Sequence, residues 1–332
     1  MIKTKGKMML AVAAIAAAVL VAACARSGEQ PAAVVPTGRT NANADAQVVP
    51  ASYDSANAST EARPAAFRTE FTAEPREVRA GAPATLAFTV KNSSGETVRD
   101  LEIVHEKPLH LLVVSDDLSE FYHIHPVQQA DGSYRVAHTF PHGGRYKLYA
   151  DFTPLGGAQV VDRFDLQVSG TSRPRVALTP DRTKTKTVAG LRVGMSPSRE
   201  LRAGQELMLD FATFDARTGR PATDLQNYLG ELAHFVIISE DAVDFLHAHP
   251  MARGAEGHGG HGDSNAAPHA HGNGAQGGTS EVSAHTTFPR AGLYKVWAQF
   301  QRSNQVITVP FVLRVAEGQP ATATGAQPAV PS

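Results

Sequence analysis

Short apolar stretches, alternating or continuous and each closed by Gly, Pro, Asn or Asp, recur through the middle of the chain. They include residues 84–90, 109–114, 146–152 and 165–168. Segments this short and this rich in β-branched and aromatic residues predict strands, and no stretch has the spacing of an amphipathic helix. Turn signals roughly every eight to twelve residues favour a sandwich of immunoglobulin-like topology over a barrel.

The same pattern occurs twice along the chain. Arg79-Ala80-Gly81 returns as Arg202-Ala203-Gly204, and Phe-x-His-x-His-Pro at 121–126 returns at 245–250. A repeat of about a hundred residues is a usual domain size. We therefore predict an all-β protein with two tandem immunoglobulin-like β-sandwich modules, at 67–170 and 187–317, joined by a linker at 171–186.

The two ends of the chain lack the strand pattern. Residues 1–23 combine three lysines, an apolar run and the small residues before Cys24, which is typical of a lipoprotein signal peptide. Lipid on Cys24 would then anchor the protein to a membrane of the cell envelope, facing the periplasm or the exterior. Ala25 is consistent with sorting to an outer membrane. Residues 24–66 and 318–332 predict a disordered tether and tail, because they hold few large apolar side chains.

Composition narrows the possible chemistry. Cys24 is the sole cysteine, which leaves the modules without a disulfide, a thiolate metal site or a cysteine nucleophile. Removing the signal peptide takes three lysines and no acid from a chain of formal charge −1, leaving −4. Nothing in this balance indicates a nucleic-acid partner. The sequence has no zinc-protease, serine-hydrolase, phosphate-loop or dinucleotide motif, so we expect no enzymatic activity.

Three histidines recur at matching positions in both modules, which makes six candidate ligands: His110, His123 and His125, then His234, His247 and His249. If Val114 pairs with Ser119 across a four-residue turn, His110 lies opposite His123. His123 and His125 then project from the same face, because alternate strand residues share a face.

Imidazole is a preferred ligand of copper and zinc. We predict one metal site in each module, with copper as the ion and zinc as the alternative. Another interpretation stays open, in which the histidines cap backbone carbonyls at strand ends and the modules are structural or adhesive.

The remaining histidines receive less support from the repeat. His105, His138 and His142 are replaced in the second copy by Leu229, Thr286 and Arg290, and His285 has Ala137 as its counterpart. An insertion at 253–279 is rich in glycine and predicts either a loop that captures metal ions weakly or a decorated linker. Its accessory candidates are His258, His261, His269 and His271. Met251, beside the histidines of the second module, is a further candidate as a soft ligand for reduced copper.

The segments 224–230, 233–234 and 245–250, with Ala-His followed by Phe-x-His-x-His-Pro, resemble the bacterial exported YtkA-like and CopC-like β-sandwich groups. The first copy departs from this pattern at 103–105. The resemblance implies handling of copper or another heavy metal at the cell envelope. A copper site at an N-terminal histidine, as in some CopC-like proteins, is unavailable, because Cys24 would be the first residue of the mature chain.

These observations give three hypotheses. The first is an envelope-anchored metal-binding lipoprotein that sequesters copper or exchanges it with a donor or acceptor protein. The second is a structural or adhesive immunoglobulin-like lipoprotein without a metal. The third, a metal-dependent enzyme, has the least support, because no catalytic motif accompanies the histidines.

Overall fold

The computed structural model describes residues 66–248, 250–251 and 279–318, and every regular element in these ranges is a β-strand. The described residues include no helix capable of spanning a membrane. The predicted signal peptide, Cys24 and His249 lie outside the described residues, as do the tether, the His-rich insertion and the tail apart from residues 66, 279 and 318. The predicted fold class, all-β with two tandem immunoglobulin-like sandwiches, is confirmed.

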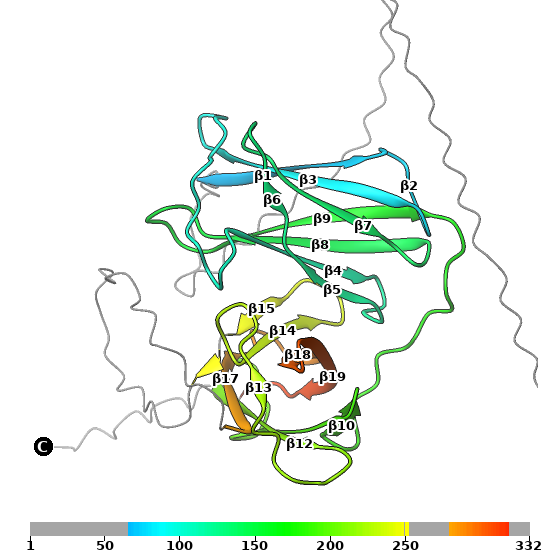
Figure 1. Ribbon diagram of the computed structural model, residues 1–332, viewed down its shortest axis with the longest axis vertical. Helices are drawn as coiled ribbons and strands as arrows, with labels where there is room; N and C mark the ends of the chain where they lie inside the picture. The colour runs from blue at the N-terminus through cyan, green and yellow to red at the C-terminus, as the bar shows by residue number, and fades with distance from the viewer. Residues whose placement is uncertain (1–65, 249, 252–278, 319–332) are drawn as a thin grey trace, which may run out of the picture. The chain divides into compact units, whose positions relative to one another are not determined.

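The first module is built from two facing sheets (Figure 1). One has the order β1-β3-β7-β6, with β1 at Phe67–Glu74, β3 at Pro83–Asn92, β7 at Tyr134–Thr139 and β6 at Val127–Gln128. The other has the order β2-β9-β8-β4-β5, with β2 at Val78–Arg79, β9 at Val160–Ser169, β8 at Gly144–Phe152, β4 at Leu109–Ser115 and β5 at Phe121–Ile124. These two strand orders are those of the immunoglobulin sandwich.

The second module repeats this arrangement. One sheet has the order β10-β11-β12-β17-β16, with β10 at Thr185–Val188, β11 at Leu191–Pro197, β12 at Glu206–Asp215, β17 at Glu281–Thr287 and β16 at Pro250–Met251. In the other, β19 joins the path β13-β18-β14-β15 through β18, with β13 at Leu225–Gln226, β18 at Gly292–Arg302, β14 at Ala233–Ser239, β15 at Phe245–Ala248 and β19 at Gln305–Val315. The strand β10 thus begins inside the segment predicted to be the linker.

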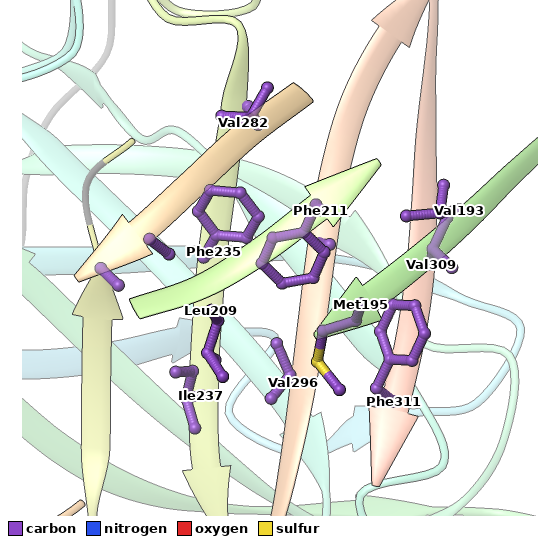
Figure 2. Packing of buried hydrophobic residues seen from close by; sticks show 14 of the residues in the cluster. Val193, Met195, Leu209, Phe211, Phe235, Ile237, Val282, Val296, Val309 and Phe311 are labelled. Carbon is purple, nitrogen blue, oxygen red and sulfur yellow. The ribbon is translucent and has the colours of Figure 1, made fainter. Parts of the chain in front are cut away.

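Alternating burial builds the core of each sandwich. In β3 the buried residues Leu86, Phe88 and Val90 point inward while their neighbours are partly exposed. Figure 2 shows the equivalent core of the second module, where the rings of Phe211 and Phe235 stack with centroids 4.5 Å apart. This period of two is what a strand with one covered face requires.

The strands β4 and β14 are different, because all seven residues of each are buried. One face of β4, including Leu111 and Val113, belongs to the core of the first module. The other face, with Leu112 and Val114, forms a separate apolar cluster together with Val236 and Ile238 of β14. This cluster is the interface between the modules, and both modules accordingly belong to one compact unit.

The contacts across this interface occur in exchanged pairs. Phe121 of β5 stacks on Trp297 of β18 with ring centroids 4.6 Å apart, and Tyr149 of β8 stacks on Phe245 of β15 at 4.8 Å. In the sequence repeat Phe121 corresponds to Phe245, and Tyr149 corresponds to Trp297. The repeat therefore converts one contact into the other, which is the signature of an interface with two-fold symmetry. Here that symmetry is approximate and internal to one chain.

Candidate metal centre

The hairpin of β4 and β5 has a different register from the one predicted. Val114 pairs with Phe121 and Leu112 pairs with His123, so the predicted pairing of Val114 with Ser119 is wrong. The loop is longer because Ser115 Oγ accepts a hydrogen bond from the Glu120 amide at 2.9 Å. A shift of two residues keeps every side chain on its face. His110 and His123 consequently still meet, as diagonal rather than opposite neighbours.

The histidines His110, His123 and His125 form a compact group that we call the first triad. One ring nitrogen from each lies within 4.8 Å of the others. His110 is 3% exposed, while His123 and His125 are half-buried. The shortest separation joins His110 Nδ1 to His123 Nε2, at 3.1 Å.

His110 and His123 each have an outer ring nitrogen, which faces away from the other ring. The hydrogen bonds of these outer nitrogens determine which nitrogen of each ring is protonated. His110 Nε2 lies 2.9 Å from the Val104 carbonyl oxygen, which can only accept. His123 Nδ1 lies 2.7 Å from Gln299 Oε1, and the amide of Gln299 is oriented by its Nε2, which donates to Thr308 Oγ1 at 3.2 Å. In the neutral rings the lone pairs of His110 Nδ1 and His123 Nε2 therefore face each other.

The second module repeats these outer contacts. His234 Nε2 lies 2.7 Å from the Tyr228 carbonyl oxygen, the counterpart of Val104. His247 Nδ1 lies 2.9 Å from a carboxylate oxygen of Asp151, which corresponds in the repeat to Gln299. In both halves, then, the histidine of the short strand is hydrogen-bonded to a residue of the opposite module.

The two groups of histidines, predicted to make one site in each module, lie beside each other at the interface. The ring centroid of His247 is 5.6 Å from that of His110 and 5.8 Å from that of His123. His234 lies 6.0 Å from His123. The docking of β4 on β14 brings both histidine-bearing faces to the same interface. We call the whole group the histidine cluster: His105, His110, His123, His125, His234 and His247.

A comparison with protein families gives a match to "Domain of unknown function (DUF8832)" in two regions, residues 66–170 and 186–317. Together these regions make up more than half of the 332-residue chain. The chain belongs to the DUF8832 family. Each matched DUF8832 region contains one sandwich and contributes histidines to the cluster.

Other comparisons add little to this assignment. No curated protein matches the DUF8832 chain. Among solved structures, the Escherichia coli adhesin FdeC is 17% identical, with 75% of this chain and 64% of that chain covered and a TM-score of 0.22. A Salmonella alpha-2-macroglobulin is 15% identical over 78% of this chain and 15% of that chain, with a TM-score of 0.26. Invasin, a bacterial integrin-binding protein, is 12% identical over 74% and 39% of the two chains, with a TM-score of 0.20. The chain thus spans less than two thirds of the length of each.

Burial sets the protonation of His123 and His125 in the DUF8832 cluster. Burial and the neighbouring rings of His247, His125 and His110 hold the pKa of His123 well below its usual range. Burial and the charges of His110 and Lys107 lower the pKa of His125 to about 3. Neutral imidazole is the form that binds a metal ion, so these rings are in the binding state at neutral pH.

The carboxylate of Asp151 is a further component of the DUF8832 cluster that the sequence did not identify. Burial raises its pKa, but the hydrogen bond and charge of His247 and the hydrogen bond from Gln159 outweigh this and leave the pKa below its ordinary value. Asp151 is 4% exposed and Gln299 is also buried. The available signal was a polar residue at the same position, next to last, in the mainly apolar segments 146–152 and 294–300.

His105 is a second missed component, because its counterpart is Leu229 and the repeat therefore gave it no support. Its ring lies 4.9 Å from His234 and 6.0 Å from His247. The backbone φ of His105 is 48° and that of Glu106 is 62°, in a tight turn closed by Val104 and Lys107. Non-glycine residues seldom adopt this left-handed conformation, and when they do it often marks a functional position.

The other histidines discounted by the repeat lie away from the cluster. His142 Nδ1 binds Glu120 Oε1 at 2.8 Å, His285 Nε2 lies 2.6 Å from Glu206 Oε1, and the ring of His138 packs against Tyr122. Met251 is the last residue of β16, and its side chain is outside what the structure describes. The accessory candidates His258, His261, His269 and His271 also fall outside the described ranges, as does His249.

Proposed function

We propose that this protein binds a copper ion, with zinc as the alternative, through the first triad. The observation that supports this most directly is the 3.1 Å approach of His110 Nδ1 and His123 Nε2, whose outer nitrogens both face hydrogen-bond acceptors. Two facing lone pairs repel each other unless a proton or a cation lies between them. Two nitrogens bound to one tetrahedral ion at about 2.05 Å are separated by about 3.3 Å, close to this distance.

His125 supplies the third imidazole of the proposed site. Its Nε2 is buried and has no hydrogen-bond partner among the described residues. A buried polar atom without a partner is costly, and ligation of an ion would remove that cost. A set of three neutral imidazoles suits copper or zinc better than magnesium or calcium, which prefer oxygen ligands.

The cellular role that we attach to this site is metal handling at the envelope. The signal-peptide pattern and Cys24 support a lipid anchor, and the resemblance to YtkA-like and CopC-like modules supports copper as the ion. The protein would sequester the ion or exchange it with a donor or acceptor protein. Burial of His110, His234 and His247 leaves little room for a substrate, which favours holding an ion over catalysis.

Metal titration of the full chain, purified in detergent, tests this proposal. The comparison variant carries alanine at His110, His123, His234 and His247, and a control variant carries alanine at His258, His261, His269 and His271. We expect tight binding of copper or zinc that is lost in the first variant and retained in the second. If the first variant still binds the metal and the second does not, the insertion is the binding site and the proposal is wrong.

The second candidate function is a structural or adhesive tandem without a metal. Each outer nitrogen described above has a protein partner, so the histidines could simply stabilise the interface. FdeC is named an adhesin and invasin an integrin-binding protein, and these names agree better with this candidate. Their TM-scores of 0.22 and 0.20 are too low to transfer an activity. If neither metal binds the full chain, this second candidate becomes the better one.

A further inference from the structure

The two halves of the histidine cluster differ at the residue that supports each short-strand histidine. His123 has the neutral amide of Gln299 behind its Nδ1, whereas His247 has the carboxylate of Asp151. The two supporting residues occupy equivalent positions on β8 and β18, and both are buried. The pseudo-two-fold axis therefore relates two surroundings of similar geometry and different charge.

A carboxylate and an amide affect an imidazole ligand differently. A carboxylate that accepts the outer N–H orients the ring and increases the electron density at its other nitrogen, which strengthens binding to a cation. It also places one negative charge beside a divalent ion, which lowers the cost of burying that ion. Asp151 is held in place for this role, because Gln159 Nε2 donates to its other oxygen at 2.7 Å.

The first module also contributes an imidazole, His105, whose ring lies against His234 and His247 of the second module. The tight turn at His105 places this ring edge-on against the ring of His234. The equivalent turn of the second module, closed by Tyr228 and Glu231, has Leu229 and Gly230 at its two left-handed positions. Leu229 has no ligand atom, so His105 has no equivalent imidazole across the pseudo-two-fold axis, and its ring lies closer to His234, at 4.9 Å, than to His110, at 6.2 Å.

We propose that the histidine cluster contains two non-equivalent metal half-sites, and that His105, His234 and His247, supported by Asp151, form the one that prefers a divalent cation. This inference rests on the proposed function, since it assigns a second ligand set within the same cluster. The first module contributes His105 and Asp151 and the second contributes His234 and His247. Binding at the second half-site therefore requires that the modules be docked.

The variants Asp151→Asn and Gln299→Glu test this inference because each nearly preserves the shape of the side chain. The full chain with alanine at His258, His261, His269 and His271 serves as background, and it is titrated calorimetrically with Zn²⁺. We expect two binding events of different affinity. Asp151→Asn should weaken one of them by about 10- to 100-fold and leave the other unchanged, as removal of a supporting carboxylate does elsewhere. Gln299→Glu should strengthen the other event.

His105→Ala assigns the weakened event to the second half-site, because it should weaken the same event as Asp151→Asn. A thermal melt of each variant checks that it is folded. A single binding event in the background protein, or equal effects of Asp151→Asn and Gln299→Glu on both events, would overturn the inference and leave the first triad intact. Absence of any Zn²⁺ or Cu²⁺ binding to the background protein would overturn both proposals.

Discussion

Two buried carboxylates on neighbouring strands of the first module have pKa values shifted in opposite directions. Asp151 on β8 interacts with the ring of His247, and its pKa lies below the ordinary value. Asp162 on β9 accepts a hydrogen bond from the backbone amide of Thr69, but burial dominates and raises its pKa. The difference shows that burial alone does not identify a functional carboxylate. The group that it contacts decides whether the charged form is stabilised.

The raised pKa of Asp162 predicts a stabilising substitution. Because the folded state favours the protonated acid, this group stabilises the protein at low pH, and that contribution is lost as the pH rises through the folded pKa. Asp162→Asn removes the buried charge and retains an oxygen that can accept from Thr69. We expect the melting temperature at pH 7 to rise by about 2–4 °C, which corresponds to about 1 kcal/mol.

Melting curves at pH 7 and at about pH 3 check this expectation, since the gain should shrink when Asp162 itself is protonated. Asp165→Asn on the same strand is the matched control, because the Asp165 side chain is 52% exposed and its change should have little effect. A gain of equal size at both pH values would contradict the assigned cause.

At the level of elements, the sequence identified the strands and the duplication but not the second face of β4. The alternation in β3 reveals one covered face, whereas the continuous apolar run at 111–114 indicates that both faces are covered. The apolar run indicates that the second face is covered, but it does not identify the surface that covers it. The register was predicted wrongly because hydrogen bonds among Ser115, Asp117 and Ser119 stabilise a longer loop than the four-residue turn.

Tyr149 links the packing of these elements to the proposed site. Its ring stacks on Phe245 and its hydroxyl donates to the Ala242 carbonyl oxygen at 2.8 Å, so both contacts cross the interface. We expect Tyr149→Phe to lower the free energy of unfolding by about 1 kcal/mol and Tyr149→Ala to lower it by about 3–5 kcal/mol. Chemical denaturation of the full chain measures both changes.

The matched control is Tyr134→Phe, which loses a comparable hydrogen bond, from its hydroxyl to the Arg99 carbonyl oxygen at 3.1 Å, within the first module. If docking supports the ligand arrangement, Tyr149→Phe weakens metal binding and Tyr134→Phe does not. Equal metal affinities of the two variants would show that the half-sites do not depend on the interface.

For the whole molecule, the repeat predicted two sites, and the structure brings them to one interface. Sequence patterns do not determine how two domains dock on each other. The contacts of His123 with Gln299 and of His247 with Asp151 therefore could not be predicted. The linker contributes to that placement. Asp117 accepts from the Val176 amide at 2.9 Å, and Asp181 accepts from the Val312 amide at 2.8 Å.

An ion held by residues of both modules should stabilise the entire folded chain. At a free metal concentration 100-fold above its dissociation constant, one site adds about 2.7 kcal/mol to the free energy of unfolding. We expect copper or zinc to raise the melting temperature of the full chain, and the variant with alanine at His110, His123, His234 and His247 to show no such rise. An equal rise in both proteins would assign the stabilisation to other ligands.

The covalent duplication has a consequence for how such a site can change over time. In a homodimer of separate modules, one gene encodes both sides of the axis, so a carboxylate gained on one side appears on the other. In the fused chain, equivalent positions can hold different residues. Asp151 is equivalent to Gln299, and His105 is equivalent to Leu229. Fusion also makes assembly independent of expression level, because the tethered partner is present at a high effective concentration. The two modules of the fused chain therefore stay together at any abundance of the protein.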